Sequence, residues 1–347
     1  MRKKIVIDCR YFGKSGIGQV NKGILDSIGD FSNFVFLGDK SKLGIYYPSV
    51  EIINDTSNPF SKKGIILSRG ITKIINSNLC FLTPAYIVPF GIKVPIYTNV
   101  LDCLFFDEKE TNNGYFDFLI KKEIYKRAIR KSKKIFTISN FSKERIKSIF
   151  KCKKEVIVLR LGLSKDIIEY KKKHFQKMQK ENSIIFVGNI KKHKGLDTLI
   201  SAFKIAREKD KYLKLYIIGN VDGLRTTLNL DNNLEKENIF IKKGINNETM
   251  FELISKCKYL VQPSRYEGMG LPPLEALYLE TNVILNDLQV FHEFYDNNLN
   301  VTYFKLNDSK DLANKILETK DYVLDDSFFS NFDYKNSVNK IFKIISK

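Results

Sequence analysis

The stretch PSRYEGMGLPPLEAL, residues 263–277, decides the fold of this chain. Apolar residues 259–261 precede it and indicate the end of a buried strand, and apolar side chains at helical spacing begin at Leu274. Proline is tolerated in the first turn of a helix, where its missing N–H would be unpaired anyway, so the helix is predicted to begin near Pro272. The segment is therefore a strand, a tight loop and a helix start. Glycines in the loop let backbone approach a ligand closely, and the N–H groups at the helix start suit a diphosphate.

Two carboxylates flank this loop, at Glu267 and Glu275. A carboxylate accepts hydrogen bonds from paired hydroxyls, such as those of a sugar or a ribose. Each residue alone has a simpler interpretation. Glu267 could be a solvated loop residue, and Glu275 could complement the helix dipole, which is worth about 0.3–1 kcal/mol.

The whole stretch resembles the signature of the GT4 family of retaining glycosyltransferases, in which seven residues separate two glutamates; Met269 stands where phenylalanine is usual. The resemblance implies an α/β protein of GT-B fold, with two Rossmann-like, doubly wound parallel-sheet domains facing a central cleft. It also implies that Glu267 contacts hydroxyls of the donor sugar and that Glu275 holds the nucleotide ribose. The backbone of residues 269–271 would meet the sugar and the phosphate.

Two further segments are similar to this family. After a predicted strand at 184–188, Lys194 matches the lysine that clamps the donor diphosphate, and Asn189 replaces the usual arginine. Lys191 is a candidate for the missing charge, although solvent exposure is its simpler interpretation. The glycine loop 13–18, after a first strand, matches a Gly-Ile-Gly loop near the donor phosphate and the acceptor. Its spacing does not support a dinucleotide fingerprint.

After a strand at 96–100, Asp102 keeps the second residue of the family's usual His-Asp pair, whereas Leu101 occupies the histidine position. Asp102 is either a base-like contact to the acceptor hydroxyl or a loop cap. The catalytic residues implied by the resemblance are Glu267, Lys194 and Asp102. The implied donor-binding residues are Gly16, Gly18, Gly188, Asn189, Lys194, Ile245, Gly268, Met269, Gly270, Leu271 and Glu275.

Strands that alternate with helices independently indicate two open parallel sheets, with ligands bound at the carboxyl ends of the strands. We expect an acceptor-binding domain at 1–170 and a nucleotide-sugar-binding domain at 171–330, with the polar tract 171–182 as the linker. A helix at 331–347 is expected to cross back to the first domain. Further predicted elements are short strands at 34–37, 45–47, 65–67 and 80–82 and a basic amphipathic helix at 119–134.

The chain has 347 residues, of which 43% are hydrophobic, and a net charge of +19. Residues 119–154 contain 14 basic and two acidic residues. Such a segment suits anionic lipid headgroups, phosphate-bearing substrates or nucleic acid, or it is a solvated lysine-rich surface. Nucleic-acid binding would require interleaved stacking aromatics, and most aromatics of this segment lie on apolar faces.

The five cysteines are scattered, as in a reduced cytosolic protein. The three histidines are far apart and no Asp-x-Asp occurs, so no metal site is predicted. Residues 1–4 precede a strand rather than a long apolar run, so no signal peptide is expected. Prolines interrupt the apolar segment 81–100, which argues against a spanning helix.

The sequence therefore predicts a cytoplasmic hexosyltransferase, peripheral at the inner face of the cell membrane, that needs neither metal nor cofactor. The donor would be a GDP-, UDP- or dTDP-linked sugar. The acceptor would be a glycan, lipid-linked, in bacterial surface polysaccharide synthesis. The resemblance implies retention by front-face attack, in which the departing phosphate accepts the acceptor proton. The alternatives are a basic nucleic-acid-binding protein and a nucleotide-sugar epimerase or phosphorylase of the same fold.

Overall fold

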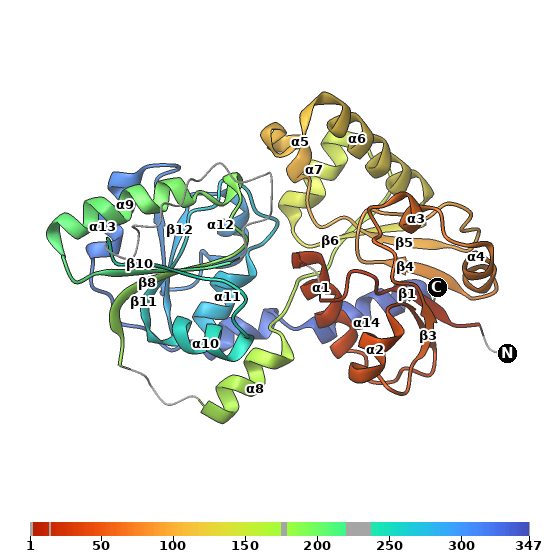
Figure 1. The fold of residues 1–347 in the computed structure, drawn as a ribbon, viewed down its shortest axis with the longest axis horizontal. Coiled ribbons are helices and arrows are strands. Elements are labelled where there is room, and N and C mark those ends of the chain that lie inside the picture. Colours follow the sequence, from red (N-terminus) through yellow and green to blue (C-terminus); the bar gives the residue numbers. More distant parts are fainter. Residues whose placement is uncertain (1–2, 14, 175–178, 220–236, 347) are drawn as a thin grey trace. The chain divides into compact units, whose positions relative to one another are not determined.

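In the computed structural model the chain forms two compact units (Figure 1). Unit 1 comprises Met1–Gly162 and Phe332–Lys347, and unit 2 comprises Leu163–Asn331. The structure describes residues 3–13, 15–174, 179–219 and 237–346. Each unit is an α/β structure built on its own parallel sheet, as predicted.

The described part of unit 1 contains a seven-stranded parallel sheet in the order β3-β2-β1-β4-β5-β6-β7. Its strands are short and mostly buried, as expected for a parallel sheet covered on both faces. They are β1 (Ile5–Asp8), β2 (Phe34–Gly38), β3 (Glu51–Asn54), β4 (Cys80–Thr83), β5 (Ile96–Asn99), β6 (Lys134–Thr137) and β7 (Val156–Val158).

Helices connect these strands, and several begin at side-chain caps; Ser139, for example, accepts a hydrogen bond from the Ser142 N–H at 3.0 Å. Figure 1 shows α5, α6 and α7 grouped in one part of the unit. The helices are α1 (Ser15–Asp26), α2 (Lys40–Tyr46), α3 (Lys62–Ile65), α4 (Arg69–Asn76), α5 (Leu104–Asp107), η1 (Lys109–Thr111), α6 (Gly114–Lys131), α7 (Asn140–Phe150) and α14 (Tyr334–Ile345).

The C-terminal helix α14 packs on α1 within unit 1. Position 23 has no room for a side chain, because a Cβ there would lie 2.4 Å from the ring of Tyr334. Two polar contacts attach α14 to the end of β7 and the segment after it: Lys340 Nζ donates to the Val158 carbonyl at 2.9 Å, and Ser337 Oγ donates to the Arg160 carbonyl at 2.6 Å.

The described part of unit 2 contains a six-stranded parallel sheet in the order β10-β9-β8-β11-β12-β13. Helices α9 and α13 cover one face, with α10 and α11 on the other (Figure 1). Phe186, Phe203 and Leu312 belong to the core between the sheet and the first pair. The elements are α8 (Lys165–His174), β8 (Glu181–Val187), η2 (Lys192–Lys194), α9 (Leu196–Lys209), β9 (Lys214–Ile218), β10 (Ile239–Lys242), α10 (Asn247–Lys256), β11 (Cys257–Gln262), α11 (Leu271–Tyr278), β12 (Asn282–Asn286), α12 (Gln289–Tyr295), β13 (Val301–Phe304), α13 (Ser309–Leu317) and η5 (Asp326–Asn331).

Two predicted strands are wrong. Residues 45–47 lie at the end of helix α2, whose N-cap Asp39 accepts the Ser41 and Lys42 N–H groups. Residues 65–67 begin at the last residue of helix α3, whose N-cap is Ser61, and continue past its end. Short apolar runs fit a strand or a helix equally well, and the capping residues upstream decide between them here. The sequence analysis also missed the strands β3 and β13.

The strand orders define a topological switch point in each sheet, where the chain changes direction across the sheet. It lies between β1 and β4 in unit 1 and between β8 and β11 in unit 2. Doubly wound sheets bind their ligands beyond the carboxyl ends of the strands at such points. The segments that follow these four strands are therefore the places to look for function.

Candidate functional site

The loop between β11 and α11 is shaped by Gly270 at the helix N-cap. Its φ of +86° is a left-handed conformation that favours glycine, and a Cβ there would lie 2.8 Å from the ring of Phe291. The Tyr295 hydroxyl donates to the Gly270 carbonyl at 2.6 Å and so holds the turn in place. Helix α11 begins at Leu271, as predicted, with Pro272 in its first turn. Of the first three residues of α11, only Leu271 has an N–H to offer to an anion, because Pro272 and Pro273 have none.

The turn after β8 lies directly against this loop. Gly195, with a φ of +67°, is so close that a Cβ would come within 2.0 Å of the Pro263 carbonyl oxygen. Arg265 holds this turn through two hydrogen bonds. The Arg265 N–H donates to the His193 carbonyl at 2.7 Å, and the Arg265 Nη1 donates to the Lys192 carbonyl at 3.0 Å. Residues about 70 positions apart thus form one surface at the switch point.

Lys194 and Glu267 meet at this point. Lys194 Nζ donates to Glu267 Oε1 at 2.7 Å, and their side chains are 19% and 11% exposed. Ser264 Oγ and Gln262 Nε2 also donate to Oε1, at 2.8 and 2.9 Å. Three donors therefore converge on one carboxylate oxygen at the edge of solvent.

These contacts keep the Glu267 carboxylate charged. Burial alone would raise the pKa of Glu267, but the Lys194 ammonium and the hydrogen bonds from Lys194 and Ser264 outweigh it and lower the pKa. Gln262 is 1% exposed, and its Oε1 has no hydrogen-bond partner among the described residues. The sequence analysis missed Gln262, Ser264 and Arg265. A polar residue at the end of an otherwise apolar strand was the available signal for Gln262.

Glu275 lies in α11, on the carboxyl side of the same loop, and its environment differs. Burial, with the nearby charge of Asp166, raises the pKa of Glu275 to about 7. The two glutamates of the motif therefore have pKa values displaced in opposite directions. Such displaced values are typical of functional sites.

The other predicted donor-binding residues of unit 2 lie in segments that follow β8, β10 and β11. Gly188 and Asn189 follow β8. A Cβ on Gly219 would lie 1.9 Å from the Gly188 carbonyl oxygen, so the backbones of Gly188 and Gly219 pack directly against each other. Ile245 follows β10 and is partly buried. Gly268 and Met269 are buried within the β11–α11 loop.

The predicted residues of unit 1 follow β1 and β5. Helix α1 starts earlier than predicted, so Gly16 and Gly18 lie in its first turn rather than in a loop. A Cβ at position 18 would lie 2.4 Å from the Tyr11 carbonyl oxygen, which explains that glycine by close packing. Asp102 follows β5, and its Oδ1 accepts the Leu104 N–H, two residues further on, at 3.1 Å, a local turn contact.

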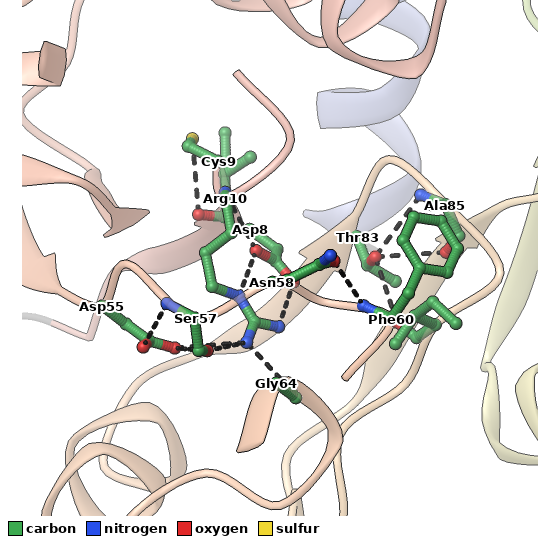
Figure 2. Close-up of polar contacts among 12 residues, drawn as sticks. Asp8, Cys9, Arg10, Asp55, Ser57, Asn58, Phe60, Gly64, Thr83 and Ala85 are labelled. Carbon is green, nitrogen blue, oxygen red and sulfur yellow. Dashed lines mark hydrogen bonds and ion pairs between the residues drawn. The ribbon is translucent and has the colours of Figure 1, made fainter. Parts of the chain in front are cut away.

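A buried arginine that the sequence analysis did not identify lies at the switch point of unit 1 (Figure 2). Arg10 pairs with Asp8 at 2.7 Å and with Asp55 at 3.2 Å, and it donates to the Gly64 carbonyl at 2.9 Å. The side chains of Arg10 and Asp8 are fully buried. Burial would lower the pKa of Arg10, but the charge and hydrogen bonds of Asp8 and the charge of Asp55 raise it. Among the described residues, no group of three or more His, Cys, Asp or Glu could hold a metal ion.

Residues 167–322 match the family model of glycosyl transferases group 1. The O-antigen chain mannosyltransferase RfbU of Salmonella typhimurium is 31% identical over 186 residues, which cover 53% of this chain and 49% of the relative. The serotype-specific mannosyltransferase WbdA of Escherichia coli is 31% identical over 140 residues, 39% of this chain and 17% of the relative. Among solved structures, Anabaena Alr3699/HepE in complex with UDP and glucose has a TM-score of 0.68 at 13% identity and covers all of both chains.

The chain thus aligns with half or less of the length of these curated relatives. The predicted resemblance to GT4-type bacterial polysaccharide glycosyltransferases is confirmed, and residues 167–322 carry it at the level of a family model. The solved structure confirms the predicted GT-B fold class of two parallel-sheet α/β units. The matched region contains Lys194, Glu267 and Glu275.

Proposed function

We propose that this protein transfers a hexosyl group from a nucleotide-diphosphate sugar to a glycan acceptor. The convergence of Lys194 and Glu267 at the switch point of unit 2 carries the proposal. A cation, a charged carboxylate and the backbone N–H groups of residues 269–271 offer one surface to an anionic and hydroxyl-rich ligand. The UDP and glucose bound to Alr3699/HepE support a nucleotide-sugar donor.

The proposed roles follow from charge and hydrogen-bonding capacity. Lys194 and the backbone N–H groups of residues 269–271 stabilise the negative charge that develops on the leaving diphosphate. Glu267 accepts hydrogen bonds from hydroxyls of the donor sugar, and Glu275 accepts those of the nucleotide ribose. Asp102 accepts a local hydrogen bond from the Leu104 N–H, and a base-like contact of this carboxylate to the acceptor hydroxyl stays a prediction.

The reaction proposed is substitution with retention and without a metal ion. The bond between the anomeric carbon and the diphosphate oxygen breaks, and the acceptor oxygen bonds to the same face of that carbon. The departing phosphate takes the acceptor proton, so no protein carboxylate has to act as a nucleophile. Gly16, Gly18, Gly188, Asn189 and Ile245 remain proposed contacts of the donor.

The proposed acceptor is a lipid-linked glycan of bacterial surface polysaccharide synthesis. The names of RfbU and WbdA, both mannosyltransferases of O-antigen or serotype type, support it. Mannose is accordingly one of the sugars to test first.

A thermal-shift screen of the purified chain against UDP-, GDP- and dTDP-sugars tests the donor. One nucleotide series should raise the melting temperature in a concentration-dependent manner, because a ligand that binds only the folded state stabilises it. The sugar should then be transferred to a lipid-linked acceptor, as measured by mass of the product. Absence of any shift across the three series, with RNA producing one instead, would overturn the proposal in favour of nucleic-acid binding.

Several cations of the basic segment 119–154 are buried or paired with carboxylates, so the segment presents less positive charge than its composition predicts. Three carboxylates from outside the segment pair with it: Asp117 with Lys121, Asp107 with Arg145 and Glu155 with Lys134. Lys121 is 9% exposed and is not a surface charge. Lys154 donates to three carbonyls at the end of α6.

We propose that the remaining cations of this segment dock the protein to an anionic membrane surface at the inner face of the cell membrane. In the described residues, no helix has the length and apolarity needed to cross a bilayer. Each basic residue near an anionic surface contributes about 1 kcal/mol, and the attraction weakens as salt rises. Replacing Lys122, Lys126 and Arg130 by Gln should reduce co-sedimentation with anionic liposomes at low salt while leaving nucleotide binding intact. If wild-type protein does not co-sediment with anionic liposomes at low salt, the proposed docking is refuted.

A further inference from the structure

A pocket of about 400 Å³ lies on helix α6 in unit 1, where its wall is almost entirely apolar. Ile87 and Phe90, from the segment after β4, form one side, and Ile120 and Ile124 of α6 form the other. A volume of this size falls within the range of about 300–1,000 Å³ that is typical of small-molecule sites. The residues of α6 that line the pocket belong to the amphipathic face predicted from the sequence.

The mouth of the pocket exposes large apolar side chains. Phe90 is 51% and Ile120 is 60% exposed, although both line the pocket. An apolar cavity that continues into exposed apolar surface is unfavourable in water unless something covers it. The apolar wall suits a hydrocarbon chain that enters from solvent.

Arg127 also lines the pocket, and its partners are neutral. Nη2 donates to the Pro89 carbonyl at 3.1 Å and Nε to the Val88 carbonyl at 3.4 Å, and the guanidinium lies 4.0 Å from the ring centre of Phe90. Among the described residues it forms no ion pair with a carboxylate. Burial, with the charge of Arg130, lowers the pKa of Arg127, as expected for a cation without a counter-ion.

One carboxylate, that of Glu123, lines the same pocket. It does not neutralise Arg127, because it pairs with Lys126 at 2.9 Å, and its side chain is 70% exposed. The pocket therefore combines an apolar wall with a partly buried, uncompensated guanidinium. That combination matches an amphiphile with an anionic head.

We propose that this pocket binds the hydrocarbon chain of a lipid phosphate, the carrier of the lipid-linked acceptor, with the phosphate paired to Arg127. The assignment rests on the proposed function for the identity of the lipid as acceptor carrier. The occupant is a single chain within the pocket, which is distinct from adhesion of the basic segment to a bilayer surface. Arg127 suits a phosphate because its planar guanidinium can donate two parallel hydrogen bonds to it.

Calorimetric titration of the full chain with hexyl, octyl and decyl phosphate, each below its micelle concentration, tests this directly. Affinity should tighten about fourfold for each added methylene that is buried, or roughly fifteenfold for each two-carbon step. Inorganic phosphate alone should show no measurable binding. Equal affinity for the three chain lengths, or binding to anionic vesicles only, would overturn the pocket assignment.

Matched variants locate the site. Ile120→Glu places a charge at the mouth and should remove the chain-length dependence, whereas Phe116→Glu, on the same helix at an 81% exposed position outside the pocket wall, should not change it. Arg127→Gln should weaken decyl phosphate at least tenfold while leaving decanol unchanged, and Arg127→Lys should retain part of the phosphate affinity. Equal losses in Ile120→Glu and Phe116→Glu would contradict the site.

The same preparations are titrated with nucleoside diphosphate, so the two proposals fail separately. If the protein binds nucleoside diphosphate but no alkyl phosphate, only the assignment of the pocket is refuted. Chain-length-dependent binding in a protein that binds no nucleotide supports the pocket and refutes the glycosyl-transfer function.

Discussion

The two switch points of this protein use similar ion pairs in opposite ways. In unit 1, Arg10 lies between Asp8 and Asp55 with its side chain fully buried (Figure 2). In unit 2, Lys194 pairs with Glu267 and both side chains retain some exposure. The side chains of Arg10 and Asp8 are fully shielded from solvent, whereas the Lys194–Glu267 pair lies at its edge.

The residue types fit this difference. A guanidinium has five donors in a fixed plane and can satisfy two carboxylates and a carbonyl at once, as Arg10 does. A lysine ammonium is a compact charge on a flexible stem and can leave one acceptor for another. We therefore expect removal of the unit 1 pair to affect stability and removal of the unit 2 pair to affect chemistry.

The largest expected effect is that of Arg10→Ala on the stability of unit 1. The change leaves Asp8 buried without its counter-charge, which costs about 3–5 kcal/mol. Urea denaturation at low temperature measures the loss. Nucleotide affinity of the folded protein should stay unchanged, and a variant as stable as wild type would show that the buried pair is not structural.

Lys194→Ala should have the next largest effect, on turnover. A charge-assisted hydrogen bond lost from the leaving group is worth about 1.5–3 kcal/mol, or roughly ten- to over a hundredfold in rate. Lys192→Ala, at an exposed position of the same turn, is the matched control and should be nearly silent. Steady-state kinetics compare them. If Lys192→Ala proves the more damaging of the two, the phosphate clamp has been assigned to the wrong residue.

Substitution of each of the two glutamates of the motif should affect a different part of the donor. Glu275→Ala should weaken free nucleoside diphosphate about tenfold, because the ribose loses its acceptor, while Glu267→Ala should act mainly on the sugar-dependent step. Calorimetry with nucleoside diphosphate and kinetics with the nucleotide sugar distinguish the roles. Equal nucleotide losses in both variants would end the proposed division.

The raised pKa of Glu275, about 7, predicts a pH dependence of nucleotide binding. The protonated form is favoured in the folded protein, so ionisation, and with it the strongest hydrogen bonds to ribose, increases as pH rises through 7. Affinity should increase up to about tenfold between pH 6 and 8 beyond the change seen in Glu275→Gln, which corrects for titration of the ligand phosphate. Stability has the opposite sign: the raised pKa makes the folded state less stable as pH rises from about 4.5 to 7. A slope shared by wild type and Glu275→Gln would exclude Glu275 as the titrating group.

The smallest expected effect is that of chelation. We expect turnover to survive EDTA, because the proposed mechanism assigns the leaving-group charge to Lys194 and backbone N–H groups. Restoration of lost activity by Mg²⁺ or Mn²⁺ would contradict the metal-independent mechanism.

Much of the fold followed from local pattern. Apolar runs that end in glycine or polar residues predicted most strands of both sheets, because a strand buried on both faces has to be apolar throughout. The β11–α11 motif predicted its own geometry, since proline and glycine restrict the backbone at known helix positions. Residues 45–47 and 65–67 were assigned wrongly because a three-residue apolar run is too short to show a helical or a strand period.

By itself, the sequence determined that Glu267, Glu275 and Lys194 belong to one family motif and its companion segment. Only the tertiary structure decided that Lys194 and Glu267 touch, since a parallel sheet brings together strand ends that lie 73 positions apart. It also decided which charges of segment 119–154 remain available, because Asp107, Asp117 and Glu155 come to it from outside. Charge counted along a chain assumes that neighbours in sequence are neighbours in space, whereas electrostatic energy depends on distance alone within a given medium. The same rule explains Arg10, whose second carboxylate, Asp55, follows a different strand.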